Sequence, residues 1–398
     1  MKKVLLLGAG YGVLSFLKSL PKEVYEETEF TLISKTTKHY HSILLHEVAS
    51  GAKDQNILFP IAKLISNKVN FIQDEVLEIK KGEVRCKAKT HSYDYLIVGL
   101  GFQSDTFNIP GIKEFAHSLV NYQEATEIKE KVYQSLDDFK NGKIDTVNIV
   151  VCGGGLSGVE LVSSFAEELT KKCKQLKIDP SSVKITCVEA LPKVLPMLSE
   201  FLSKDTEKYL RSVGISVETN CKVLECKEDS IIVEQNGEKK TIPSTLTIWT
   251  AGVKGSSVIE NSPFFTSKRS RVEVDRFMKP INQENQADME NVFILGDCGA
   301  LLDETTGRFY PPTAQIACQE GTYLGKVFKN YLQGKEVQKK FVFNYQGVFC
   351  SVGHKYAVGM FANAKELRGL GAVVIKQAIE AKWQIALEGI KGIRRSFS

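Results

Sequence analysis

The sequence predicts an α/β protein with two Rossmann-like dinucleotide-binding domains, the second inserted in the first, and a C-terminal membrane-associating segment. Two glycine-rich turns, at 8–12 and 153–158, each follow a short apolar run and open a helical pattern. A third apolar run, 291–295, ends in the pair Gly296–Asp297. Strand, glycine turn and helix in this order are typical of a fold that binds a dinucleotide. The 398 residues also exceed one ordinary hydrophobic core, so more than one domain is expected.

The first turn follows a β-rich run at 4–7 and precedes a helix that Pro21 ends. Glycines let the backbone turn sharply and approach a pyrophosphate, which rests on the positive end of the helix. The turn departs from the usual pattern because Val13 stands at the third glycine position and no acid follows the second strand. Its candidate cofactor-binding residues are Gly8, Gly10, Gly12, Ser34 and Lys35.

The second turn matches the pattern fully. A strand at 148–152 precedes it, a long helix follows, and a strand at 183–188 ends at Glu189. A carboxylate in that position accepts hydrogen bonds from ribose hydroxyls and repels a 2′-phosphate, which favours NADH over NADPH. The glycines that the pattern requires are Gly153, Gly155 and Gly158.

Two further strands, 95–101 and 246–252, also end in glycine turns and look like the crossovers that join the two nucleotide domains. We therefore expect an interleaved organisation. The expected boundaries are 1–110 and 251–330 for the first domain, 111–250 for the second, and 331–398 for a C-terminal domain.

Composition excludes several classes of protein. A net charge of +5 over the whole chain is too small to indicate nucleic acid binding. Nine cysteines without a C-x-x-C pair argue against a disulfide scaffold, zinc knuckles and a dithiol reductase. The sequence has no run of 18 apolar residues, so no transmembrane helix is expected. The cluster of His39, His41, His46 and Glu47 has no convergent spacing, so no metal site is expected.

Several motifs together resemble the type II NADH:quinone oxidoreductases, a family of flavoproteins with two dinucleotide-binding domains, over nearly the whole chain. The most discriminating motif is Ala-Gln-x-Ala-x-Gln at 314–319. The other matching segments are 247–253, 294–298, 351–353 and 357–359. The segment 343–347 is shorter than the family's usual form.

The resemblance implies one non-covalent FAD in the first domain, contacted by Gly8, Gly10 and Asp297, and NADH as substrate in the second. It also implies that Glu160 lies near the meeting point of nicotinamide and flavin. Gln315 and Gln319 match two glutamines that border the quinone site. The remaining cofactor contacts expected are Gly296, Ala251 and Gly252. Members of the family are commonly homodimers.

The three candidate catalytic residues, Glu160, Gln315 and Gln319, also have ordinary structural explanations. Glu160 lies in the first turn of a helix, where an acid complements the helix dipole. Gln315 and Gln319 are four residues apart and share one helix face, which could simply be solvated. Their amides can donate to quinone carbonyls and do not titrate.

The C-terminal segment predicts an amphipathic helix. Apolar residues recur at steps of three and four from Ile375 to Phe397, and basic residues, Lys376 among them, form the polar face with Glu380. Such a helix, with Trp383 and a basic face, suits a membrane surface. The alternatives are a final helix docked on the core and a dimer contact.

The expected function is non-proton-pumping NADH:quinone oxidation in the respiratory chain. A hydride passes from NADH to FAD, and two electrons then reduce a membrane quinone. The expected location is the cytoplasmic face of the cell membrane, as a peripheral protein. One alternative is a sulfide:quinone oxidoreductase, whose chemistry would use cysteines such as Cys152, Cys298, Cys318 or Cys350. The other is a non-enzymatic sensor of flavin and NADH.

Overall fold

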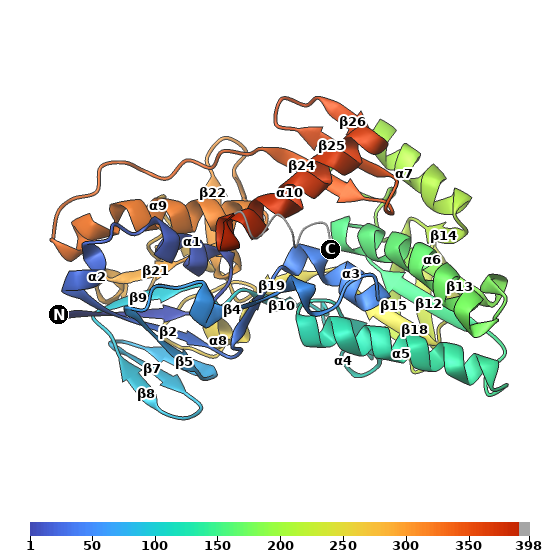
Figure 1. Cartoon of the computed structure of the whole chain (residues 1–398), viewed down its shortest axis with the longest axis horizontal. Coiled ribbons are helices and arrows are strands. Elements are labelled where there is room, and N and C mark those ends of the chain that lie inside the picture. Colours follow the sequence, from blue (N-terminus) through green and yellow to red (C-terminus); the bar gives the residue numbers. More distant parts are fainter. Residues whose placement is uncertain (390–398) are drawn as a thin grey trace. The chain divides into compact units, whose positions relative to one another are not determined.

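The computed structural model describes residues 1–389, and these form two compact units. Each unit is built from three separate stretches of the chain (Figure 1). Unit 1 comprises Met1–Tyr40, Leu58–Gln103 and Lys254–Tyr345. Unit 2 comprises His41–Ile57, Ser104–Val253 and the residues from Gln346 onward.

A five-stranded parallel sheet forms the centre of unit 1, in the order β21-β9-β1-β2-β5. Its strands are β1 (Lys2–Leu7), β2 (Thr28–Ser34), β5 (Val69–Gln73), β9 (Tyr95–Val98) and β21 (Val292–Ile294). Strand β9 is buried throughout, and β1 and β2 are buried over their later residues, as expected of a parallel sheet that is covered on both faces. Both faces must therefore be apolar, which explains the continuous Val, Leu and Ile runs.

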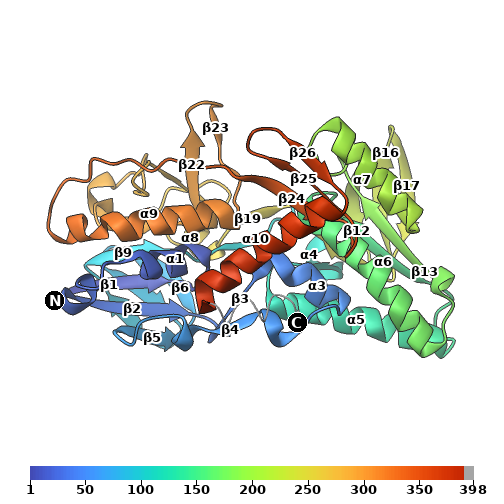
Figure 2. The ribbon, with the colours of Figure 1, turned by 45° about the horizontal axis from the view of Figure 1, so that its top comes forward.

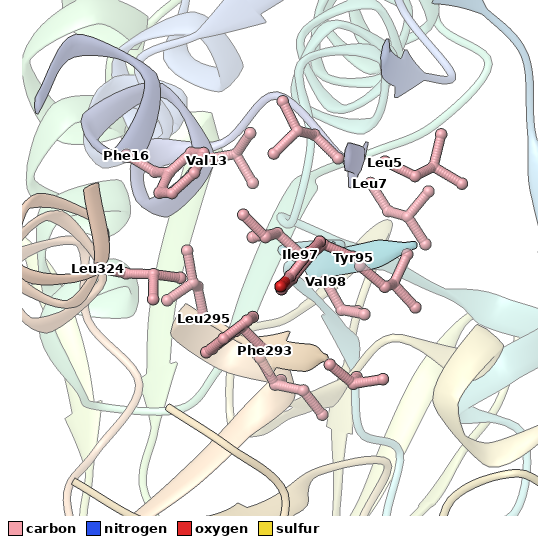
Figure 3. Close-up of a cluster of buried hydrophobic side chains, with 14 of the residues drawn as sticks. Leu5, Leu7, Val13, Phe16, Tyr95, Ile97, Val98, Phe293, Leu295 and Leu324 are labelled. Atoms are coloured by element: carbon pink, nitrogen blue, oxygen red, sulfur yellow. The ribbon is translucent and has the colours of Figure 1, made fainter. Parts of the chain in front are cut away.

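Helices α1 (Tyr11–Ser19) and α9 (Ala314–Leu332) lie side by side in unit 1 (Figures 1 and 2). They approach closely because Gly321 has no side chain: a Cβ there would lie 2.0 Å from the carbonyl oxygen of Gly12. Figure 3 shows their apolar side chains pointing toward those of the sheet. Labelled residues of this core include Leu5, Leu7, Val13, Phe16, Ile97, Phe293 and Leu324.

Smaller elements complete unit 1. They are α2 (Val24–Glu27), β3 (Lys38–Tyr40), β4 (Leu58–Pro60), β6 (Val76–Lys80), β7 (Glu83–Cys86), β8 (Thr90–Ser92), α8 (Ser257–Glu260), β20 (Val272–Val274), β22 (Gly299–Asp303) and β23 (Arg308–Phe309). Two further strands, β10 (Phe102–Ser104) and β19 (Val253–Gly255), lie where the chain passes between the units.

Unit 2 repeats the plan of unit 1, with a five-stranded parallel sheet in the order β11-β18-β12-β13-β14. Its strands are β11 (Ala116–Ser118), β12 (Val147–Cys152), β13 (Val183–Val188), β14 (Ile215–Glu218) and β18 (Leu246–Trp249). Its other elements are α3 (Leu45–Ser50), α4 (Ile112–Phe115), α5 (Tyr122–Lys140), α6 (Leu156–Leu176), α7 (Glu200–Ser212), β15 (Cys221–Cys226), β16 (Ser230–Gln235) and β17 (Glu238–Pro243). The short helix α3, which comes from the first stretch of this unit, packs against both α5 and α6.

The C-terminal part of unit 2 is a three-stranded antiparallel sheet followed by a long helix, α10 (Leu370–Glu388). The strands are β24 (Gly347–Ser351), β25 (Ala357–Phe361) and β26 (Glu366–Arg368). Helix α10 packs on all three (Figure 2), around a small core that contains Phe349 and Ala372. The expected segment 331–398 is thus shared: its residues up to Tyr345 belong to unit 1, and those from Gln346 to Gly389 belong to unit 2.

Candidate active site

Both predicted glycine turns have the backbone geometry that requires glycine. Gly8 has φ +86°, and a Cβ there would lie 2.3 Å from the carbonyl oxygen of Gly99. In unit 2, Gly153 has φ +118° and lies directly against Ala251. A Cβ on Gly158 would lie 1.8 Å from the carbonyl oxygen of Gly153. Larger residues would therefore push each helix away from the end of its strand.

The helices that follow the two turns begin without a side-chain cap. Gly10 precedes α1 and Gly155 precedes α6, and neither can supply an acceptor for the first N–H groups. Among the other long helices, three have a side-chain cap, from Asn121, Ser199 and Thr313, whereas α10 also lacks one but does not follow a parallel strand and glycine turn. Uncapped N–H groups at the positive end of a helix form an anion site, and each fits one pyrophosphate.

Unit 1 places a carboxylate where the first dinucleotide fold needs one. Asp297 lies in the turn after β21, and no protein group within residues 1–389 donates a hydrogen bond to it. Burial raises the pKa of Asp297 to about 6, against the opposing effect of Arg271. This carboxylate is therefore available to accept hydrogen bonds from the hydroxyl groups of a ligand.

Glu320 is a functional candidate that the sequence analysis missed. Its side chain is buried in α9, and its Oε2 accepts a hydrogen bond of 2.7 Å from the Gly296 N–H. Burial raises the pKa of Glu320 to about 8, with a further contribution from Asp297. Glu320 is four residues from both Ile316 and Leu324, which are buried, and this spacing could have revealed it.

The remaining unit 1 candidates differ in position. Lys35 forms an exposed ion pair with Glu75, whereas Ser34 is buried at the end of β2. The ring of His39 lies 2.9 Å from the carbonyl oxygen of Ala9 in the glycine turn. Burial lowers the pKa of His39 to about 4, so a neutral imidazole supports the turn.

The two glutamines of α9 are both partly exposed in unit 1. The amide of Gln319 is hydrogen-bonded twice to the backbone of Asn344, with Nε2 donating to its oxygen and Oε1 accepting from its nitrogen, each at 2.9 Å. These bonds fix the segment that leads to Tyr345. They leave Gln319 one N–H and one lone pair for a ligand.

In unit 2, Glu189 is held by the backbone of the glycine turn. Its Oε2 accepts a hydrogen bond of 2.6 Å from Gly154 N–H, and its Oε1 accepts one of 2.8 Å from Leu191 N–H. The carboxylate is therefore fixed at the end of β13, beside the turn. Each oxygen retains a lone pair that can accept a ribose hydroxyl.

Glu160 lies in a buried ionic cluster. The Nζ of Lys376 lies 2.7 Å from its Oε1, Ser351 N–H donates to Oε1 at 3.2 Å, and His46 Nδ1 lies 3.6 Å from Oε2. Burial alone would raise the pKa of Glu160, but the positive Lys376 and the other partners lower it overall. Glu160 is therefore an ionised carboxylate with three polar neighbours. The expectation that it lies in the first turn of its helix is wrong, because α6 begins at Leu156 and has no acid in that turn.

The expectation that Lys376 belongs to a solvated basic face is wrong. Its side chain is buried and forms the ion pair with Glu160. Glu380, which was placed on the same face, is also mostly buried. The apolar residues Val374, Ile379 and Ile385 are instead exposed. Lys376 is buried because the carboxylate of Glu160 lies beside it. Glu380 is one turn along the same helix from Lys376, whereas Lys382 is exposed. The predicted residues beyond 389 lie outside the described part of the chain.

The cysteines considered for sulfide chemistry are mostly buried. Burial raises the pKa of Cys298 to about 12 and that of Cys350 above its ordinary value, while Cys152 is shifted in the same direction. Because the thiolate is the reactive form, these side chains are inert thiols. Cys318 is partly exposed. All nine cysteines are free.

Two groups of side chains have ligand atoms within 4.8 Å of one another. They are Asp74, Cys86 and His91, and Glu167, Glu168 and His354. In each group a carboxylate already accepts backbone hydrogen bonds, Asp74 from Ala88 and Glu167 from His354. Asp74 therefore holds the turn at Ala88, and Glu167 connects α6 to the loop at His354.

Comparison with known proteins first defines the class. The profile of the family described as "Pyridine nucleotide-disulphide oxidoreductase" matches residues 2–321. The structure of NDH2 from Plasmodium falciparum in complex with NADH superposes with a TM-score of 0.88 at 20% identity, covering 100% of this chain and 96% of that one. The sulfide:quinone oxidoreductase from Aquifex aeolicus gives 0.76 at 18% identity, covering 98% and 92%. The predicted fold class of two dinucleotide-binding domains is confirmed.

The sequence comparison defines the family more narrowly. The Type II NADH:quinone oxidoreductase of Staphylococcus aureus (strain MSSA476) is 34% identical over 397 residues, which are 98% of this chain and 96% of that protein. The same protein from strain NCTC 8325 is equally similar. The chain therefore belongs to the type II NADH:quinone oxidoreductase family.

Proposed function

We propose that this chain oxidises NADH and reduces a membrane quinone, with one FAD as its cofactor. The observation that carries the proposal is a pair of helices, one in each unit, that begin without a side-chain cap directly behind a parallel strand and a glycine turn. Two such sites fit two dinucleotides. When bound, FAD supplies the chemistry that accepts a hydride and releases electrons.

The residues of unit 1 would hold FAD. The N–H groups at the start of α1 bind its pyrophosphate, and Gly8, Gly10 and Gly12 keep the backbone close. Asp297 accepts hydrogen bonds from the hydroxyl groups of FAD. Gly296 forms the turn that carries Asp297, and Glu320 fixes this turn by accepting the Gly296 N–H. Ser34 and Lys35 lie at the end of β2, the position of ribose contacts in this fold.

The residues of unit 2 bind NADH. The turn at Gly153, Gly155 and Gly158 receives its pyrophosphate, and Glu189 accepts hydrogen bonds from its ribose. Ala251 borders this turn, since a Cβ on Gly153 would lie 2.7 Å from its backbone nitrogen, and Gly252 is the next residue along the chain. Glu160 orients the nicotinamide end, and its ion pair with Lys376 keeps it charged at this position.

Gln315 and Gln319 donate hydrogen bonds to the quinone carbonyls in this proposal. Their amides do not titrate, so they orient the quinone without supplying its protons. The overall reaction transfers two electrons and does not move ions across a membrane. No helix among residues 1–389 is long and apolar enough to cross a bilayer.

The proposal extends to binding at a membrane surface, on its cytoplasmic face, where NADH is available. Four large apolar side chains on α10 are exposed: Leu370, Val374, Ile379 and Ile385. At about 3.6 residues per turn Leu370, Val374 and Ile385 lie on one side of the helix, and such an exposed apolar side gains free energy by entering the lipid interface, which also holds the quinone. A homodimer, as the family resemblance implies, is part of the proposal and can be measured by sedimentation velocity.

An anaerobic titration of the purified flavoprotein tests the function. NADH is added first and a short-chain quinone second, while the flavin absorbance is recorded. We expect bleaching by NADH and full recovery with quinone. A flavin that bleaches but does not recover would indicate a sensor or another acceptor. A flavin that only sulfide bleaches would indicate the sulfide:quinone reaction.

A further inference from the structure

The group of Asp74, Cys86 and His91 lies on the small antiparallel sheet of β6, β7 and β8 in unit 1 (Figure 1). Asp74 precedes β6, Cys86 is the last residue of β7, and His91 is the middle residue of β8. One ligand atom of each side chain lies within 4.8 Å of the other two. All three residues belong to the same stretch of unit 1, so the arrangement involves this unit alone.

We infer that Asp74, Cys86 and His91 bind one zinc ion, with water as the fourth ligand. The ion joins the three strands at one end of their sheet. Zinc has no redox chemistry, so it takes no part in electron transfer. The inference goes beyond the proposed function and does not depend on it.

Each of the three side chains has bonding capacity that the protein leaves unused. His91 Nε2 is buried and has no hydrogen-bond partner among residues 1–389. Cys86 is 4% exposed, and its thiol has no partner in the described part of the chain. Asp74 is 9% exposed, and no ion pair within the same residues compensates its charge. A buried carboxylate without a cation costs free energy, and a bound cation recovers it.

Backbone N–H groups hold the Asp74 carboxylate in position. Its Oδ1 accepts hydrogen bonds of 2.8 Å from Glu75 N–H and 3.2 Å from Ala88 N–H, and its Oδ2 accepts one of 3.2 Å from Ala88 N–H. Oδ2 therefore retains a lone pair for a ligand. Hydrogen bonds of this kind orient the carboxylates that bind metal ions. Asp74 can thus bind a cation without giving up its contacts to the turn.

The donor set favours zinc over the hard cations. Calcium and magnesium prefer ligand sets of oxygen alone, whereas zinc binds thiolate, imidazole and carboxylate together. A tetrahedral zinc ion places its ligand atoms about 3.5 Å apart, so the three side chains must approach one another by about 1 Å. As the Zn–S bond forms, the Cys86 thiol releases its proton to water, and His91 donates a lone pair. The thiolate and the Asp74 carboxylate then balance the two positive charges.

The other group with similar spacing, in unit 2, lacks these features. His354 Nε2 lies 3.2 Å from a carboxylate oxygen of Glu168 and 3.3 Å from one of Glu167. Lys171 forms an ion pair of 2.7 Å with Glu168. The His354 side chain is also 51% exposed, so water hydrates it. This group has its charges compensated and serves as a control.

Zinc binding to the full-length, flavin-loaded protein tests the inference. Protein treated with a chelator is titrated with Zn²⁺, and the metal retained after gel filtration is counted by elemental mass spectrometry. We expect one zinc ion per chain. X-ray absorption at the zinc edge should show one sulfur ligand at about 2.3 Å and nitrogen or oxygen ligands at about 2.0–2.2 Å. Zinc should also raise the melting temperature by about 2 °C or more.

Three variants each remove one ligand. Cys86→Ser and His91→Gln should weaken zinc affinity by about 100-fold or more, and Cys86→Ser should also remove the sulfur signal. Asp74→Asn retains an acceptor for the turn but loses the charge, and should weaken affinity by about tenfold or more. Flavin content and the melting temperature without zinc establish that each variant is folded.

The matched controls are His354→Gln and Cys318→Ser, which change an exposed imidazole and a partly exposed thiol outside the group. Both should bind zinc as wild type does. Wild-type protein that retains no zinc would overturn the inference, and so would zinc bound without a sulfur ligand. Loss of zinc from either control, with zinc retained in Cys86→Ser, would place the ion elsewhere and overturn it too. Because no readout uses quinone turnover, these results leave the proposed function untouched.

Discussion

The Nζ of Lys376 lies 2.7 Å from Oε1 of Glu160, and the two side chains are only 8% and 7% exposed. The pair connects α10 to the helix that begins at the second glycine turn. A buried ion pair loses far more when one partner is removed than when both are replaced, because the remaining charge is left without compensation. The pair is thus a positional constraint on Glu160.

Lys376→Met should reduce the free energy of unfolding by about 3–5 kcal/mol, because Glu160 then remains buried without its ammonium. The double variant Lys376→Met with Glu160→Gln should recover most of this loss. Urea unfolding of the three proteins measures both values. A double variant no more stable than the single one would show that packing, not charge, dominates.

Glu189→Ala should lower kcat/KM for NADH by about tenfold or more, which corresponds to about 1.4 kcal/mol of lost binding. The change removes the acceptor for ribose and the support of the turn at Gly154. Its effect on NADPH should be smaller, because repulsion of the 2′-phosphate is lost at the same time. Steady-state kinetics with both nucleotides check this prediction. The control is Glu200→Gln, which changes an exposed side chain of α7. Comparable wild-type turnover with NADPH would contradict the assignment.

Glu320 should make stability decrease as pH rises. Its folded-state pKa of about 8 lies above the ordinary value of 4.5, so the folded protein binds the proton more tightly. The resulting stabilisation is complete below about pH 4.5 and is lost as pH rises to 8, by about 1.4 kcal/mol per unit. Glu320→Gln lacks this dependence. Unfolding curves of both proteins from pH 5 to about pH 9 should therefore diverge, and parallel curves would exclude a raised pKa.

Gly321→Ala should destabilise unit 1 by about 1–3 kcal/mol, because the new methyl group would overlap the Gly12 carbonyl oxygen and force α1 from α9. Flavin affinity should fall too, since α1 carries the first turn. Gly371→Ala is the matched control: its Cβ meets only Leu367, at 3.5 Å, and it should be neutral or stabilising. Thermal unfolding and flavin release measure both. Equal effects of the two variants would contradict the close helix packing.

Val374→Glu combined with Ile385→Glu should weaken binding to phospholipid vesicles by about tenfold or more, since both side chains are exposed on the same side of α10. Val342→Glu, at an exposed position in unit 1, is the control. Vesicle co-sedimentation measures binding, and reduction of a water-soluble quinone should be unchanged. Unaltered sedimentation would place the membrane contact elsewhere.

The sequence was sufficient for features that depend on local spacing. The glycine turns, the strand at 183–188 and Glu189 at its end follow from residues that are close in sequence. The apolar run at 4–7 also lies within β1, and the long helix expected after the second turn is α6. Such patterns reflect the backbone directly, because a tight turn or a buried strand restricts each position in it.

Contacts between distant segments could not be predicted in this way. Lys376 looked like a solvated cation because nothing near it in sequence shows that Glu160 lies beside it. Glu320 was overlooked for the same reason, since its partner Gly296 belongs to another element. The short helix α3 joins unit 2 although the residues before and after its segment belong to unit 1, and no composition change marks this.

The interleaving of the two units also sets an order for folding during synthesis. Unit 1 lacks β21 and α9 until its third stretch, Lys254–Tyr345, has left the ribosome. Until then the inner face of α1 has no helix to pack against. Unit 2 is completed later still, because α10 is synthesised after all its other helices and strands. Glu160 stays hydrated until Lys376 has been synthesised and has folded against it. Chaperones would therefore meet a nascent chain with two unfinished cores, which only the final stretches complete.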